Sequence, residues 1–290
     1  MSIKKVTKAI LPVAGFGTRF LPATKATPKE MLPIIDKPLV QYAVEEAALV
    51  GIKEIIFITN HTKSSIERHF SKSSQLEEKL ISSNKKHLLK KINPDILQDL
   101  TYKYINQEDQ LGLGHAISLA KDEINDEPFA VLLPDDLFIS KPSCMHQLLS
   151  TFNKYQKSVI AVNKIHSDNI HNYGVISTKD ISSPYKLDGI IEKPSADKAP
   201  SNIAVCGRYI LSSDIFNHLQ NIKKDHSGEI QLTDAIQSLI QKEDVMACLY
   251  EGEKYDCGSK KGYIEATIKM ALNDDSIKKD ITSFIRDIVE

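Results

Sequence analysis

The first 140 residues alternate between short apolar runs and longer amphipathic stretches. The runs at residues 9–14, 53–60 and 129–133 have the length of buried strands and are rich in Ile, Leu, Val and Phe. Residues 38–51 and 62–70 carry apolar side chains at helical spacing. Strand, helix, strand, helix is the order of a doubly wound, Rossmann-like α/β fold, so we expect a mostly parallel sheet.

Two further regions depart from this alternation. Residues 71–98 place leucine and isoleucine at helical spacing with lysines on the other face, which predicts one amphipathic helix. Four successive strands are predicted at 158–164, 174–178, 187–192 and 203–211. Because no long helix separates them, we expect a smaller antiparallel extension of the sheet that covers one side of a cleft.

The chain ends in an amphipathic segment, residues 276–290. Its apolar stripe consists of Ile277, Ile281, Phe284, Ile285 and Ile288. Such a stripe packs either on its own domain or on another subunit, and the sequence leaves both alternatives open. The whole chain of 290 residues is expected to form a single domain, 1–290.

Composition and charge exclude several classes of partner. The formal net charge is only −1, so no broad basic surface for nucleic acid or a membrane is expected, and any positive site must be local. The four cysteines lie far apart without a CxxC pair, which indicates neither a zinc site nor a disulfide framework. The apolar runs are too short for a membrane span or a secretory signal. We therefore expect a soluble cytoplasmic protein with free thiols.

A glycine-rich loop follows the first predicted strand. Gly15 and Gly17 suit a backbone that turns tightly or approaches a ligand closely, and Arg19 and Lys29 add positive charge. Backbone N–H groups of such a turn can form an anion site, so the stretch predicts a polyphosphate cradle. It lacks the Gly-Lys-Ser/Thr of a Walker A loop, and Phe20 stands where a dinucleotide fingerprint needs its third glycine.

Acidic residues follow two later segments of the chain. Asp135 and Asp136 come directly after the strand at 129–133, at the end where open α/β sheets gather ligand groups. We expect one of them to cap the next helix or stabilise a turn, and the other to bind a metal. Asp256 stands in a second turn, before Gly258.

The stretch GFGTRFLPATKATPKEMLPIIDKPLVQYAVEE resembles the signature of the sugar-1-phosphate nucleotidylyltransferases. Six later segments extend the resemblance over nearly the whole chain: GLGHA (112–116), LLPDD (132–136), EKP (192–194), APSNIAVCGRYIL (199–211), GEIQLTDAI (228–236) and YDCGSKKGY (255–263). Together they favour the uridylyltransferase branch of the family. The chain departs mildly from the pattern at 259–261 and in 166–172, which leaves the sugar-side loop open.

The resemblance implies that glucose 1-phosphate attacks the α-phosphate of UTP, giving UDP-glucose and diphosphate, with Mg²⁺ as cofactor. The attacking phosphate oxygen is already anionic, so the reaction needs cations and a metal rather than a general base. The implied catalytic cations are Arg19, Lys29 and Lys193. Because no step needs an acid or base, we expect His115 to have a structural role at a helix start.

The resemblance also assigns the remaining site residues, motif by motif. The triphosphate would be held by Gly15, Gly17, Thr18 and Arg19, assisted by Lys29. The base would contact Ala14, Gly15, Glu30, Gln107 and Gly112. The sugar would meet Glu192 and the backbone around Gly174, with Lys193 on the sugar phosphate. Asp135 and Asp256 are the implied Mg²⁺ ligands, since Mg²⁺ takes one or two carboxylates plus phosphates and water.

These roles divide the expected domain. Residues 1–140 would mainly bind the nucleotide, residues 141–275 would mainly bind the sugar, and residues 276–290 would form a C-terminal helix. The resemblance further implies a homodimer or homotetramer.

Three alternatives remain open at this stage. The same chemistry could use another base or sugar, as in a thymidylyltransferase. The fold could instead serve a catalytically silent nucleotide-sugar sensor, although a sensor has no use for the full ionic set. A nicotinamide-dependent oxidoreductase is a third reading, weakened by the missing third glycine.

Overall fold

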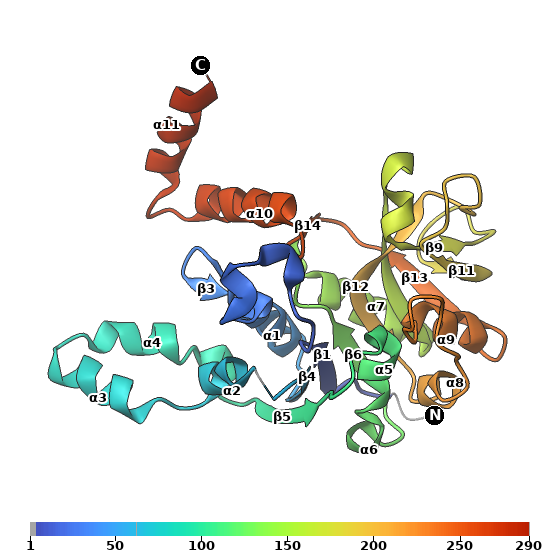
Figure 1. The fold of residues 1–290 in the computed structure, drawn as a ribbon, viewed down its shortest axis with the longest axis horizontal. Coiled ribbons are helices and arrows are strands. Elements are labelled where there is room, and N and C mark those ends of the chain that lie inside the picture. The colour runs from blue at the N-terminus through green and yellow to red at the C-terminus, as the bar shows by residue number, and fades with distance from the viewer. Residues whose placement is uncertain (1–3, 62, 290) are drawn as a thin grey trace.

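The computed structural model describes residues 4–61 and 63–289 and centres on a ten-stranded sheet (Figure 1). Its path runs β10-β13-β8-β12-β6-β1-β4-β5, with β9 paired to β12 and β11 paired to β9. The strands are β1 (Lys8–Pro12), β4 (Glu54–Thr59), β5 (Thr101–Asn106), β6 (Phe129–Leu132), β8 (Ser158–Lys164), β9 (Gly174–Ser177), β10 (Tyr185–Lys186), β11 (Gly189–Glu192), β12 (Ile203–Leu211) and β13 (Val245–Leu249).

The directions of the strands confirm the predicted fold class. β1 is parallel to β4 and β6, β4 is parallel to β5, and β13 is parallel to β8. β12 runs antiparallel to β6 and β8, and β9 is antiparallel to β11 and β12. A mostly parallel sheet with an antiparallel extension is therefore present, and the extension is continuous with the main sheet.

Helices cover both faces of the sheet, as expected for a doubly wound fold. They are α1 (Leu39–Leu49), α2 (Ser64–Phe70), α3 (Ser74–Ser82), α4 (Leu89–Ile92), α5 (Gly112–Ser118), α6 (Lys121–Ile124), α7 (Cys144–Tyr155), α8 (Ile215–Leu219), α9 (Leu232–Ile240), α10 (Lys260–Asn273) and α11 (Lys278–Val289). α1, α2 and α7 pack with Ala9 and Leu11, whereas α5, α8 and α9 pack with Ile10. Successive residues of β1 therefore feed two separate cores, because side chains alternate across a strand.

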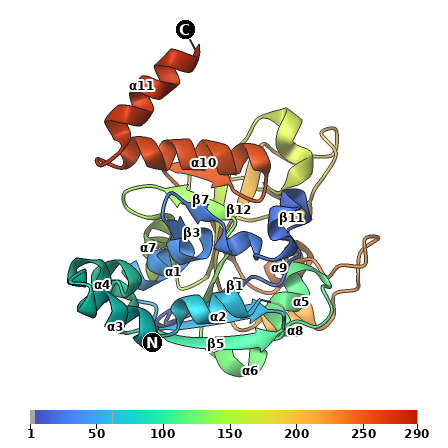
Figure 2. The same cartoon turned by 60° about the vertical axis from the view of Figure 1, so that its left-hand side comes forward.

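The prediction of one helix over residues 71–98 is wrong. The segment forms an arm in which α3 and α4 lie side by side, apart from the sheet (Figures 1 and 2). The chain reverses after α3 at Asn84, whose φ of 57° is left-handed and breaks the helix. The apolar spacing is therefore divided between two short helices, and Leu76 and Ile81 of the predicted stripe remain exposed.

Two short ribbons complete the fold. β2 (Pro33–Ile34) pairs with β3 (Lys37–Pro38), and β7 (Asp136–Ile139) pairs with β14 (Glu253–Asp256), antiparallel in both cases. Asp136 therefore opens a strand, and the predicted helix cap is wrong: the helix that follows, α7, is capped by the Ser143 hydroxyl. The second ribbon brings Asp256 opposite Asp136.

The terminal segment does not fold back onto the sheet. α11 packs against the end of α10 and projects away from the body, as both views show (Figures 1 and 2). Phe284 and Ile288 of the predicted stripe are 60% and 65% exposed. Thr62 of the predicted helix 62–70, Glu290 of the segment 276–290 and residues 1–3 of the predicted domain lie outside the described residues.

Candidate active site

The cleft at the carboxyl ends of β1, β6 and β11 consists of two hollows that share a wall. The smaller, about 340 Å³, is lined by the predicted nucleotide residues Ala14, Gly15, Lys29, Glu30, Gln107 and Gly112. The larger, about 930 Å³, is lined by the predicted residues Arg19, Gly174, Glu192, Lys193 and Asp256. Asp135 lines both hollows. The structure thus brings the predicted base-contacting residues to the smaller hollow and the predicted sugar residues to the larger one. Arg19 of the predicted triphosphate set lines the larger hollow, and Glu229 lines both hollows as Asp135 does.

The glycine loop is shaped by a left-handed residue. Gly17 has a φ of 64°, and a Cβ built on it would lie 3.0 Å from the Lys29 Cβ. Its carbonyl accepts a hydrogen bond of 2.7 Å from the Thr24 hydroxyl. Thr18 and Arg19 follow on the exposed turn Thr18–Phe20, and the Arg19 guanidinium donates to the Gly258 carbonyl at 3.5 Å. Glycine is required here because an L side chain would meet both strain and crowding.

On the nucleotide side, Glu30 and Gln107 are buried polar residues with partners. The Glu30 carboxylate lies 2.8 Å from the Lys63 ammonium. The Gln107 amide bonds the His115 ring at 3.0 Å, and His115 lies within α5. Gly112 has a φ of 90°, and a Cβ there would lie 2.8 Å from the Glu229 side chain, so this position also requires glycine.

On the sugar side, Gly174 and Glu192 lie opposite one another in the pair of β9 and β11. The Glu192 carboxylate accepts a 2.6 Å hydrogen bond from the Thr233 hydroxyl, which fixes its direction. Lys193 follows with a φ of 42°, and its backbone N–H bonds the Tyr173 carbonyl. Its ammonium is half exposed and lies 3.5 Å from Glu192, so it can reach an anion in the cleft.

Asp135 and Asp256 converge on the space beside Gly258. A Cβ built on Gly258 would lie 3.1 Å from an Asp135 oxygen, 3.0 Å from an Asp256 oxygen and 3.7 Å from the Arg19 guanidinium. The Asp135 carboxylate also lies 2.7 Å from the Lys29 ammonium. Within the described residues no group of three or more His, Cys, Asp or Glu forms a metal cage. Two carboxylates in a small open space fit Mg²⁺, which completes its shell with phosphates and water.

The charges of this cluster shift its pKa values in opposite directions. Burial favours a neutral Asp135, yet the Lys29 ammonium outweighs it and lowers the pKa of Asp135. Burial, followed by the nearby Asp136 and Asp135 carboxylates, raises the pKa of Asp256. A cation placed between the two carboxylates would relieve the repulsion that raises the pKa of Asp256.

Asp136 has a different role from its neighbour. Its carboxylate accepts from the Lys254 ammonium at 2.9 Å and from the Gly207 backbone N–H at 3.0 Å. Both side chains of the pair are mostly buried, at 14% and 12% exposed. Asp136 therefore ties β7 to β12 and β14 rather than pointing with Asp135 at the metal space.

Sequence reasoning missed three polar residues that shape the cleft: Lys63, Thr233 and Lys254. Thr233 and Lys254 line the larger hollow, and Lys63 holds the glycine loop from behind. The apolar patterns gave no signal for them, because each stands just outside or at the start of its element. The predicted free thiols are confirmed, since all four cysteines are unpaired and buried. Burial raises the pKa of Cys257 to about 12, so this thiol is no nucleophile.

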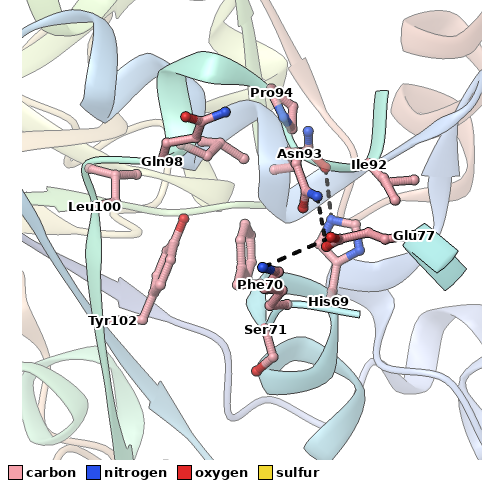
Figure 3. Close-up of a pocket in the computed structure, with 13 residues that line it drawn as sticks. His69, Phe70, Ser71, Glu77, Ile92, Asn93, Pro94, Gln98, Leu100 and Tyr102 are labelled. Atoms are coloured by element: carbon pink, nitrogen blue, oxygen red, sulfur yellow. Dashed lines mark hydrogen bonds and ion pairs between the residues drawn. The ribbon is translucent and has the colours of Figure 1, made fainter. Parts of the chain in front are cut away.

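A further cavity, about 510 Å³, lies between α2 and the arm (Figure 3). Phe70 and Tyr102 stack on one side of it with ring centroids 5.1 Å apart, and His69 and Glu77 lie across from them. Its one lining lysine, Lys72, is 4.0 Å from the Glu77 carboxylate. A wall of aromatic rings with a neutralised cation does not suit a triphosphate, so the cleft is the better candidate for the active site.

A model of the nucleotidyl transferase family matches residues 8–273, which include both hollows. The chain belongs to this family. A UTP–glucose-1-phosphate uridylyltransferase of Bacillus subtilis (strain 168), YngB, is 44% identical over 288 residues, covering 99% of this chain and 97% of that one. A Staphylococcus epidermidis protein of the same name is 45% identical over 290 residues, covering 99% of both chains.

Solved structures agree with this family assignment. A UDP-glucose pyrophosphorylase complexed with UDP-glucose is 42% identical, with a TM-score of 0.85 over 93% of this chain and 100% of that chain. A UTP-bound enzyme from Acinetobacter baumannii is 36% identical, with a TM-score of 0.90 over 97% and 99%. The likeness spans nearly the whole family domain, so the cleft belongs to the conserved architecture rather than to an addition.

Proposed function

We propose that this protein is a UTP–glucose-1-phosphate uridylyltransferase: UTP and glucose 1-phosphate give UDP-glucose and diphosphate. The observation that carries the proposal is a pair of adjoining hollows that both include Asp135. The predicted base-contacting residues line one hollow, and the predicted sugar residues line the other together with Arg19. Relatives that share over 40% of their residues with the chain have this name, and solved relatives are described with UDP-glucose or UTP.

The arrangement suits an in-line displacement between two bound anions. The glycine loop and Arg19 would hold the triphosphate, while Lys193 would hold the sugar phosphate against its α-phosphorus. Glu192, oriented by Thr233, would accept hydrogen bonds from glucose hydroxyls. Holding both reactants in this geometry makes the reaction effectively unimolecular, and the cations lower the repulsion between the two phosphate groups.

We propose Mg²⁺ as the cofactor, held by Asp135 and Asp256. Their oxygens border the same small space, and both are hard ligands of the kind Mg²⁺ prefers. When bound, the metal would neutralise charge that develops on the phosphate oxygens. Lys29, paired with Asp135 at 2.7 Å, would contribute a second positive charge from the nucleotide side.

The organisation of the domain is part of the proposal. Residues up to 140 supply the nucleotide side, residues 141–275 supply the sugar side, and α11 supplies a contact between subunits. The exposed Phe284 and Ile288 support a homodimer or homotetramer in which α11 is covered. Four unpaired thiols suit a reducing compartment, so we place the protein in the cytoplasm. Among the described residues, no helix combines the length and apolarity that a membrane crossing requires.

The decisive experiment measures diphosphate release from a panel of nucleotides and sugar phosphates. UTP with glucose 1-phosphate should give the highest kcat/KM, and chelation of Mg²⁺ should abolish turnover. A preference for dTTP would move the chain to the thymidylyltransferase alternative. Binding of UTP and UDP-glucose without turnover of any pair would favour the sensor.

A further inference from the structure

Lys63 is a buried lysine that sequence reasoning did not place in the site. It stands between β4 and α2, and its side chain is only 6% exposed. Its ammonium donates to the Val13 carbonyl, to the Gly15 carbonyl at 2.6 Å and to the Glu30 carboxylate at 2.8 Å. An ammonium has three N–H donors, so all three are used. Lys63 therefore has no donor left for a substrate, and any effect on catalysis must pass through the groups that it holds.

Those groups belong to the nucleotide hollow. Val13 and Gly15 flank Ala14 in the glycine loop, and the Ala14 carbonyl is held separately by Asn60 at 2.7 Å and Gln110 at 2.9 Å. Ala14, Gly15 and Glu30 all line the smaller hollow. One side chain from the segment between β4 and α2 thus ties together the loop and the carboxylate that face the nucleotide hollow.

The peptide geometry gives this contact a direction. In a trans peptide unit the carbonyl and the N–H point to opposite sides. Because the Val13 and Gly15 carbonyls face Lys63, the N–H groups of Ala14 and Phe16 in the same units face away from it. A concave anion site depends on such N–H groups pointing the same way. Lys63 therefore keeps the donors of the loop turned outward.

The energetics also favour a held geometry. Burial lowers the pKa of Lys63 and raises the pKa of Glu30, because burial disfavours the charged form of each group. Burying the two together is tolerable because every donor is satisfied and the carboxylate is paired. Loss of either partner would leave the loop without its anchor and a polar group without a partner.

We propose that Lys63 is a positioning residue for the nucleotide: it presets the glycine loop and Glu30 for UTP without contacting UTP. The proposal rests on the proposed function for the identity of the nucleotide. It concerns the nucleotide half alone, since the contacts of Lys63 all lie on that side of Asp135. Removal of Lys63 should therefore weaken the binding of UTP and leave the KM for glucose 1-phosphate nearly unchanged.

The test compares Lys63→Met and Lys63→Arg with Lys8→Met. Lys8 is a matched control because it is a mostly buried lysine on β1 that donates to a backbone carbonyl, Glu123, at 2.8 Å. It lies at the other end of that strand from the loop. Three quantities are measured for each variant. Calorimetry gives the affinity for UTP, and steady-state kinetics at saturating UTP give the KM for glucose 1-phosphate. Hydrogen exchange is followed on peptides that cover residues 13–20.

Lys63→Met should weaken UTP binding roughly 10- to 100-fold, the equivalent of lost hydrogen bonds to a charged group. Its KM for glucose 1-phosphate should stay within about twofold of wild type, and exchange at 13–20 should accelerate. Lys63→Arg, which keeps a charge and several donors, should recover most of the affinity. Lys8→Met should resemble wild type in all three measurements.

The proposal is overturned if Lys63→Met binds UTP normally, or if it raises both substrate constants equally. A merely structural lysine would give the second result. If Lys63→Met does not fold, Lys63→Gln takes its place, with the same split between the two substrates expected. Should the wild-type protein fail to bind UTP, the proposed function is wrong, whereas the hydrogen exchange comparison still decides whether Lys63 holds the loop.

Discussion

The Lys29 ammonium and the Asp135 carboxylate lie 2.7 Å apart, at the boundary between the two hollows of the cleft. Lys29 comes from the short helical turn Lys29–Met31 behind the glycine loop, and Asp135 comes from the end of β6. The pair places a cation and a proposed metal ligand at the point where the α-phosphorus of UTP would meet the sugar phosphate. Asp135 and the neighbouring Asp136 are therefore expected to have different roles, the first in metal binding and the second in stability.

Asp135→Asn and Asp256→Asn should each lower kcat by about 100-fold or more, because each removes a carboxylate from the space proposed for Mg²⁺. Asp136→Asn should reduce kcat much less. It should instead lower the free energy of unfolding by about 1–3 kcal/mol, since the mostly buried Lys254 loses its charged partner.

Steady-state kinetics and urea unfolding of the three variants give the comparison. Binding of Mn²⁺ with UTP, followed by electron paramagnetic resonance, supplies a readout apart from turnover. Equal losses of kcat in Asp135→Asn and Asp136→Asn would show that the two carboxylates share the metal.

Lys193→Ala should raise the KM for glucose 1-phosphate about tenfold and lower kcat, because its ammonium is proposed to meet the sugar phosphate. Arg19→Ala should act mainly on UTP. Lys198→Ala is the matched control, an exposed lysine of the same loop, and should leave both constants near wild type. The division of roles is wrong if Lys193→Ala weakens the binding of UTP as strongly as the binding of glucose 1-phosphate.

The half-buried His69 should make stability depend on pH. Burial lowers its pKa below the ordinary value of 6.5, and its ring bonds Gln41 at 2.7 Å. The unfolded chain then binds more protons than the folded one between the two pKa values. Its contribution to stability is therefore complete above about pH 6.5 and is lost as the pH falls toward the folded pKa.

The measurement is the melting temperature between about pH 5 and about pH 7.5. His69→Gln should show a smaller fall at acid pH than wild type. His87→Gln, at an exposed position of the neighbouring arm, is the control and should keep the wild-type dependence. An unchanged pH profile in His69→Gln would exclude this imidazole as the source.

The terminal helix should hold subunits together. Phe284 and Ile288 are exposed, and burying such side chains contributes about 1.5–3 kcal/mol each before the cost of association is subtracted. Light scattering should therefore give a mass of two or four chains. Truncation after Asp275, or Phe284→Ser, should lower that mass while UTP binding remains.

Arg286→Ser changes the same helix at a position off the apolar stripe and should leave the mass unchanged. A single-chain mass for the intact protein at micromolar concentration would contradict the assembly. An unchanged mass after truncation would move the contact to another surface.

The sequence allowed the sheet and most of the cleft to be predicted, because apolar periodicity reports burial directly. The buried runs at β1, β4 and β6 were found, and residues that follow β1 and β6 line the candidate cleft. β7 and β14 were missed because each is only four residues long and β14 carries three charged residues, so neither gives an apolar run long enough to predict a strand. Lys63 was missed for another reason: a lysine at the start of a helix looks like any exposed cation until its acceptors are known.

The β7–β14 ribbon also has a consequence for how the protein is made. Asp135 leaves the ribosome long before Asp256, and the ribbon that brings them together is the last pairing of strands along the chain. A nascent chain can assemble β1, β4, β5 and β6 and still lack half of its proposed metal site. On the proposed function, nucleotidyl transfer would therefore require that β14 has been synthesised and has paired with β7, and a chain that stops before Asp256 would lack one proposed metal ligand.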